Sequence, residues 1–132
     1  MAKPRAKRLD FAVSLDRDGR ATAGGTTIAV PETWEAEHLV LAGLARCSLT
    51  SLRYHARRAG IAVGAEATAR GEVTRREEDG CYAFVEIECS FDVMLEPKPD
   101  DSAVNELLAK AERDCFVGNS LRPEPAYVWN VA

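Results

Sequence analysis

Long apolar runs are missing from this chain of 132 residues. No stretch approaches the roughly 18 apolar residues that a membrane-spanning helix needs. The basic first eight residues are followed by the alternating LDFAVSL rather than by the continuous apolar core of an export signal. We therefore expect no membrane insertion and a cytoplasmic location.

Metal-ligand spacing is also missing. The four cysteines include no Cys-x-x-Cys pair, and His38 and His55 have no paired ligand spacing, so we expect no structural zinc site. A structural disulfide framework is also not expected, because thiols are kept reduced in the cytoplasm. The arginine clusters at 53–58 and 70–76 lack the interleaved aromatic residues of a base-stacking surface. With a net charge of −4, the chain is not expected to bind nucleic acid.

What is present fits a single α+β domain over residues 1–132. Apolar periodicity and turn signals predict strands, helices and a hairpin with its turn at 76–80. Gly60 is the expected stop of the first helix, and Asp100 or Asp101 the expected cap of the second. In order, we expect strands at 9–15, 20–23 and 26–30, a helix at 37–59, strands at 61–75 and 81–95, a helix at 102–117 and a strand at 127–131. The sheets are expected to be antiparallel, with the two main helices packed on them.

Two cysteines lie on strands and two on helices. In the second hairpin strand Cys81 and Cys89 share an apolar face with Ile87, while Phe84 lies on the opposite face. Both are therefore expected to fill the core. Cys47 and Cys115 lie one on each predicted helix. They are either a second pair of core thiols or a redox pair, in which one thiol is oxidised to a sulfenic acid and the other condenses with it.

Several segments resemble the OsmC/Ohr superfamily of peroxide-detoxifying proteins. EHLVLAGLARC at 37–47 resembles the start of that family's first long helix, and AERDCFVGNSL at 111–121 its second-cysteine segment. The Arg-Asp-Gly-Arg turn at 17–20 is similar to the arginine-containing turn that precedes the helix. The resemblance extends over nearly the whole chain. Four positions depart from it. Phe116 stands where the family often has proline, Gly118 replaces a serine, and Arg46 and Ser48 flank Cys47 where small or aromatic residues are common.

The resemblance implies a role for each of four residues. Cys47 would be the peroxidatic cysteine and Cys115 the resolving one. Arg17 would lower the pKa of the Cys47 thiol and bind the peroxide, and Glu37 would hold the arginine. Arg20 is a rival for the arginine role and Glu35 for the carboxylate. No metal, flavin or haem is implied.

The implied activity is thiol-dependent reduction of organic or lipid hydroperoxides, through a Cys47 sulfenic acid and a Cys47–Cys115 disulfide that an external dithiol reduces. The alternatives are a non-enzymatic OsmC-like protein that binds a small lipid or acyl compound, and a structural or regulatory domain with inert thiols. On a continuous helix Glu37 lies about 15 Å from Cys47 of its own chain. We therefore expect an intertwined homodimer in which Glu37 serves the partner's cysteine.

Overall fold

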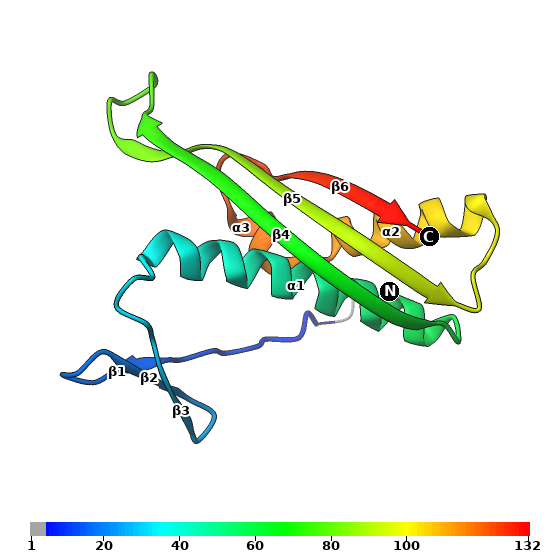
Figure 1. Ribbon diagram of the computed structural model, residues 1–132, viewed down its shortest axis with the longest axis horizontal. Coiled ribbons are helices and arrows are strands. Elements are labelled where there is room, and N and C mark those ends of the chain that lie inside the picture. Colours follow the sequence, from blue (N-terminus) through cyan, green and yellow to red (C-terminus); the bar gives the residue numbers. More distant parts are fainter. Residues whose placement is uncertain (1–4) are drawn as a thin grey trace. The chain divides into compact units, whose positions relative to one another are not determined.

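The computed structural model describes residues 5–132. These residues divide into two compact units, one ending at Glu35 and the other spanning Ala36–Ala132 (Figure 1). The prediction that they form one domain stays a prediction. No helix among the described residues is long and apolar enough to cross a membrane.

The first unit is a three-stranded antiparallel meander. Its strands are β1 (Ser14–Leu15), β2 (Arg20–Ala23) and β3 (Thr26–Ala29), in the order β1-β2-β3. The predicted first strand, 9–15, is reduced to its last two residues. The reason is that β2 has only four residues, and its pairs with β1 stop at Ser14, so residues 9–13 have no ladder partner.

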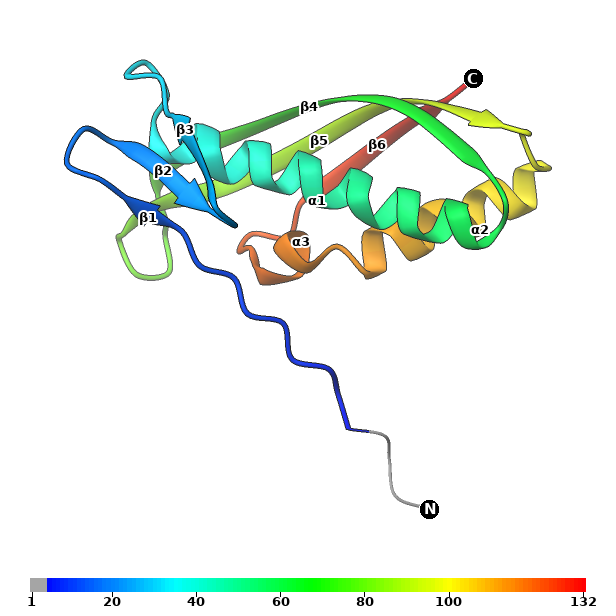
Figure 2. The same cartoon turned by 90° about the horizontal axis from the view of Figure 1, so that it is seen from below.

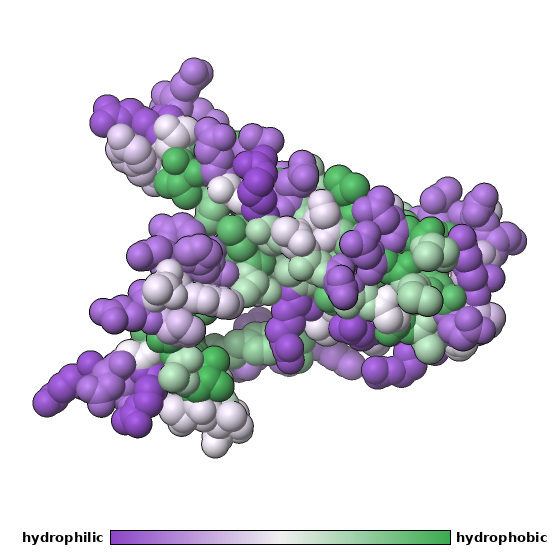
Figure 3. Space-filling model, viewed as in Figure 1, coloured by the Kyte–Doolittle hydropathy of each residue, from purple (hydrophilic) through white to green (hydrophobic). Residues whose placement is uncertain are grey.

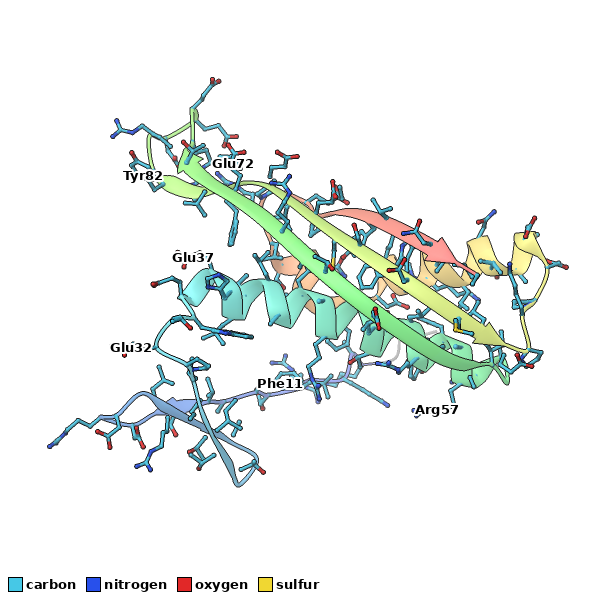
Figure 4. All side chains as sticks on the ribbon, in the orientation of Figure 1. Phe11, Glu32, Glu37, Arg57, Glu72 and Tyr82 are labelled. Atoms are coloured by element: carbon cyan, nitrogen blue, oxygen red, sulfur yellow. The ribbon has the colours of Figure 1, made fainter. Side chains whose placement is uncertain are left out.

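The meander has no core of its own. None of residues 5–35 is buried, and Phe11 is 86% exposed. Phe11 projects from the extended segment before β1 (Figure 4), and apolar side chains reach the surface of this unit (Figure 3). The other exposed apolar residues here include Leu9, Val13, Leu15 and Ile28. Such a sheet needs a further apolar surface to cover it.

The second unit is a three-stranded sheet with helices on one face (Figures 1 and 2). β4 (Ala62–Arg75) and β5 (Tyr82–Glu96) form the predicted hairpin, and β6 (Ala126–Val131) pairs with the other edge of β5. β6 runs parallel to β5, so this sheet is mixed rather than wholly antiparallel. Parallel neighbours need a crossover connection, and here the segment between β5 and β6 supplies it with two helices.

The first helix, α1, spans Ala36–Arg58, close to the prediction. It ends as predicted at Gly60, which has a φ of 74°. The Ile61 N–H donates to the Ala56 carbonyl at 2.9 Å, which closes the helix in a Schellman pattern. The buried side chains of α1 pack with those of β5 and the second long helix in one core: Leu44, Leu52, Ala56, Ile87, Cys89, Phe91, Val93, Leu95, Val104, Leu107, Ala111 and Cys115.

The predicted second helix is broken in two. α2 spans Asp101–Arg113 with Asp100 as its cap, as predicted, and a short α3 covers Phe116–Ser120. Cys115 therefore caps α3 and does not lie within a helix. The Asn119 side chain donates to the Arg113 carbonyl at 2.9 Å, which satisfies the end of α2 and stabilises the break.

A β-bulge in β5 changes the face on which its side chains lie. The register with β4 shifts at this point and leaves Val85 without a partner. Phe84 consequently packs against the core together with Ile87, although strict alternation had placed them on opposite faces. Gly71 on β4 makes room, because a Cβ there would lie 2.5 Å from the Phe84 ring.

The hairpin cysteines have opposite environments. Cys89 is fully buried on β5, as predicted. Cys81 is exposed and precedes β5, so the core position predicted for it is wrong. Its N–H donates to Asp79 Oδ1 at 3.0 Å, which holds Cys81 in the turn and away from the core.

Candidate functional site

Cys47 lies in the middle of α1, half buried, on the side that faces the α2–α3 break. The Val117 N–H, in α3, points at Cys47 Sγ at 3.5 Å. Cys47 and the second-cysteine segment are thus in contact although 70 residues separate Cys47 from Val117.

Cys115 is fully buried beside Cys47. Its Sγ accepts a hydrogen bond from the Gly118 N–H at 3.3 Å, and Ser48 Oγ lies at 3.3 Å from it. Ser48 directly follows Cys47 on α1, so the same turn of the helix meets both sulfurs. Both thiols are free.

Further contacts hold α1 against α2. Ser51 Oγ donates to the Ala111 carbonyl at 2.8 Å, and His55 Nε2 lies 2.7 Å from Asp114 Oδ2. The helices α1 and α2 lie side by side (Figure 2). The prediction that the two cysteine-bearing segments are neighbours is confirmed.

The surroundings of Cys47 favour a protonated thiol. Burial raises its pKa above the ordinary value, and the nearby Cys115 thiol raises it further. The N–H groups of Val117 and Phe116 act in the opposite direction. No cation is among the groups that shift it. A peroxidatic role therefore needs a positive charge close enough to lower the pKa of Cys47, which no group that shifts this pKa in the Ala36–Ala132 unit supplies.

Cys89 is a third thiol next to this pair. Burial raises its pKa to about 11, with a smaller contribution from Cys115. It stays protonated at neutral pH and belongs to the core. Within residues 5–132 no three His, Cys, Asp or Glu side chains converge as the ligands of a metal would.

The arginine turn favours Arg17 over Arg20. The guanidinium of Arg20 binds Asp16 at 2.8 Å and Asp18 at 3.7 Å, which stabilises the turn. Among the described residues Arg17 has no hydrogen bond or ion pair, and its side chain is exposed. Arg17 belongs to the first unit and Cys47 to the second, so their pairing stays a prediction.

Glu37 lies in the first turn of α1 (Figure 4). Because α1 is continuous through Cys47, the two residues are about 15 Å apart along it. The structure thus brings Cys47 and Cys115 together and keeps Glu37 away from both.

Sequence reasoning missed two side chains of this site, Ser48 and Tyr127. The Tyr127 hydroxyl lies close to Ser48 and Cys115, and burial raises the pKa of Tyr127 well above its ordinary value. Tyr127 lies on β6 opposite Cys89 of β5 in the parallel ladder. The sequence gives no local signal for that long-range pairing.

Fold and site together define an α+β protein with a pair of free thiols between its long helix and its second-cysteine segment. The sequence profile of OsmC-like proteins matches residues 30–129. The protein therefore belongs to the OsmC-like family, and the resemblance found in the sequence is confirmed. No curated protein sequence matches it.

The similarity to solved structures with the same fold extends over nearly the whole chain. An OsmC-like protein of unknown function from Vibrio cholerae is 16% identical with a TM-score of 0.72, covering 96% of this chain and 100% of its own. An OsmC-like protein from Mycoplasma pneumoniae is 20% identical with a TM-score of 0.69, covering 97% and 98%. The organic hydroperoxide resistance protein OhrB of Bacillus subtilis is 20% identical with a TM-score of 0.57, covering 93% and 96%. These similarities establish the α+β fold.

Proposed function

We propose that the protein is a thiol peroxidase that reduces organic hydroperoxides. The observation that supports this most directly is the contact of two free thiols, Cys47 and Cys115, that come from segments far apart in the sequence. Two free thiols in contact can pass from dithiol to disulfide with little movement of the chain. Structures similar to this protein include some described as organic hydroperoxide resistance proteins, which is consistent with organic hydroperoxides as the substrate class.

The reaction has three steps. The Cys47 thiolate attacks one peroxide oxygen, the O–O bond breaks, and the alkoxide takes a proton to leave as an alcohol, which makes Cys47 a sulfenic acid. The Cys115 sulfur then displaces hydroxide from Cys47, and water leaves as the disulfide forms. An external dithiol reduces that disulfide by exchange and is itself oxidised. Neither metal nor organic cofactor takes part in the proposed reaction.

Arg17 and Glu37 complete the proposed site. A guanidinium near Cys47 would offset the burial that raises the pKa of this thiol. Its planar donors would bind a carboxylate on one edge and the peroxide on another. Arg17 has no described partner that competes for it, unlike Arg20.

The site is proposed to be shared between two chains in a homodimer. Glu37 lies about 15 Å from Cys47 of its own chain. Two α1 helices packed antiparallel about a two-fold axis would bring Glu37 of one chain to Cys47 of the other. Exposed apolar residues at the start of α1, Leu39 at 44% and Val40 at 36%, and those of the meander would supply the buried surface.

Thiol counting during peroxide titration tests the proposed function. Reduced protein is titrated with cumene hydroperoxide, and the remaining free thiols are measured after denaturation. We expect two of the four thiols to disappear per equivalent of peroxide, with a Cys47–Cys115 disulfide found by peptide mass analysis. Cys47→Ser should consume no peroxide, whereas the matched variant Cys81→Ser, at the exposed turn, should behave like the wild type. Retention of all four thiols by the wild type would refute the proposal.

A non-enzymatic binding protein is the second candidate. The raised pKa of Cys47 is the observation in its favour, because a protonated thiol is a poor nucleophile. A binding protein would keep its four thiols in the same titration.

A further inference from the structure

Three polar groups surround the Cys115 sulfur. The Gly118 N–H and Ser48 Oγ each lie at 3.3 Å from Sγ. The Tyr127 hydroxyl is the third, since it lies beside Gly118 and close to both Ser48 and Cys115. They come from α3, α1 and β6, and the sulfur at their centre is fully buried. The rest of the core around it is apolar, so these three groups fix the orientation of the thiol.

The hydrogen-bond directions around the sulfur are largely determined. The hydroxyl of Ser48 has one hydrogen, which it donates to the Leu44 carbonyl at 2.8 Å. Ser48 Oγ therefore acts as an acceptor towards Cys115. The Gly118 N–H can only donate. Ser48 Oγ can thus accept the S–H hydrogen of Cys115, and the Gly118 N–H can stabilise the negative charge on the sulfur when the proton leaves.

Tyr127 is held rigidly in place. Its ring stacks at 6.3 Å from that of Phe91 and at 6.2 Å from that of Trp129. Phe91 and Trp129 in turn stack at 4.1 Å. The Trp129 Nε1–H donates to Glu112 Oε2 of α2 at 3.0 Å. This row fixes β6 against the helix and leaves the tyrosine hydroxyl little freedom.

Gly118 makes the position of the hydroxyl possible. A Cβ added there would overlap the Tyr127 oxygen and would lie 3.3 Å from Cys115 Sγ. In the sequence pattern that this segment resembles, a serine stands at this position. The hydroxyl that such a serine would carry next to the sulfur is here provided by Tyr127.

We propose that Tyr127 and Ser48 are positioning residues for the second step, the attack of Cys115 on the Cys47 sulfenic acid. This inference rests on the proposed function. As the S–S bond forms and the S–O bond of the sulfenic acid breaks, the Cys115 proton passes to the departing hydroxide, which leaves as water. The Tyr127 hydroxyl and the Gly118 N–H stabilise the developing thiolate, and the first step, at Cys47, does not use them.

The variants Tyr127→Phe and Ser48→Ala test the role in the Cys81→Ser background, which lacks the exposed thiol. After one equivalent of cumene hydroperoxide, sulfenic acid is trapped with dimedone at successive times and quantified by mass spectrometry. We expect the rate of Cys47 oxidation to change less than about twofold and the sulfenic acid to live about tenfold longer, the effect of losing a hydrogen bond to a charged group. More Cys47 should reach the sulfinic state. Disulfide formation at the wild-type rate in both variants would overturn the inference.

A pair of double variants supplies the matched control. Tyr127→Phe with Gly118→Ser returns a hydroxyl to the side of the sulfur, whereas Tyr127→Phe with Gly118→Ala adds the same carbon without the hydroxyl. We expect the serine to restore faster disulfide formation and the alanine not to. Equal rates in the two double variants would overturn the inference, because a purely structural role of Tyr127 would not distinguish them.

A measurement without peroxide separates this inference from the proposed function. The disulfide reagent DTNB forms a mixed disulfide with Cys47, and the attack of Cys115 then releases a second thionitrobenzoate. We expect this second release to be about tenfold slower in Tyr127→Phe and Ser48→Ala. Slowed release together with a Cys47 that peroxide does not oxidise would refute the peroxidase and retain the positioning role. Unchanged release would refute the positioning role.

Discussion

At the scale of single residues, the reactivity of Cys47 depends on two opposing effects. Burial and the Cys115 thiol raise its pKa, while two backbone N–H groups from the start of α3 lower it. A thiol of ordinary pKa near 8.5 is already mostly protonated at neutral pH. The proposed activity thus requires a cation, and Arg17, with no partner among the described residues, is the candidate.

Replacing Arg17 should make the pKa of the Cys47 thiol higher. In the Cys81→Ser background, iodoacetamide alkylation of Cys47 is followed as a function of pH. We expect the half-point of Arg17→Met to lie about 1 unit or more above that of the wild type, the usual effect of losing a nearby opposite charge. Arg46→Met, next to Cys47 but exposed, is the control and should not shift the half-point. A shift in Arg20→Met but not in Arg17→Met would assign the role to the rival arginine.

At the scale of elements, the break between α2 and α3 positions the second cysteine. A continuous helix from 102 to 117, as predicted, would have placed Cys115 in an α-helical turn without a capping role. Instead Cys115 Sγ caps α3 through the Gly118 N–H. Asp114, just before it, binds His55 of α1 and Arg113, which ties the break to the helix that carries Cys47.

Asp114 should make stability pH-dependent in acid. The Arg113 guanidinium, with His55 contributing less, lowers the pKa of Asp114 from 3.8 to about 2. A carboxyl with a depressed folded-state pKa stabilises the fold above the unfolded value, and that stabilisation is lost as the pH falls from about 4 to 2. Asp114→Asn should therefore lower the free energy of unfolding at pH 5 by about 0.5–1 kcal/mol, the range for a partly exposed ion pair, and the two curves should converge near pH 2.

Urea unfolding between pH 2 and 5 measures this effect. Asp10→Asn, at a carboxylate exposed in the first unit, is the control and should follow the wild-type curve. An Asp114→Asn curve parallel to that of the wild type over the whole range would contradict the assigned ion pairs.

At the scale of the whole molecule, the apolar surfaces that each unit leaves exposed predict that two chains associate. None of the side chains of residues 5–35 is buried. Phe11, Leu15 and their apolar neighbours nevertheless alternate with polar or small residues along the segment. A sheet of three short strands without a buried face is marginal in water. A second chain that covers these residues and the start of α1 would give the meander the core that it lacks.

Mixing two inactive variants tests whether the site is shared. Glu37→Gln and Cys47→Ser are each expected to be nearly inactive alone. After unfolding and refolding together, half of the dimers should be mixed, and each mixed dimer has one intact site if Glu37 serves the partner. Peroxide consumption should therefore recover to about a quarter of the wild-type value. Light scattering on the same samples should give the mass of a dimer.

Absence of recovery in mixed dimers would place Glu37 and Cys47 in the same site of one chain. An active monomer would exclude the shared site altogether. The control mixture, Cys47→Ser with Cys115→Ser, should recover no turnover, because both cysteines of a site are proposed to come from one chain.

The sequence by itself determined the elements whose signals are local. The periodicity of α1, its stop at Gly60 and the turn at 76–80 depend on residues within a few positions of one another. The family resemblance likewise depends on short segments around Cys47 and Cys115. These features were predicted correctly because nearest-neighbour backbone preferences and one buried face suffice to specify them.

Only the tertiary structure decided the features that depend on distant contacts. The parallel pairing of β6, the bulge at Val85 and the hydroxyls of Tyr127 and Ser48 around Cys115 each join segments well separated in the chain. The burial of Cys89 and the exposure of Cys81 also follow from where the turn ends and the sheet begins. Side-chain periodicity specifies which face of a strand is apolar, but which partner covers that face is set by the packing of the complete core.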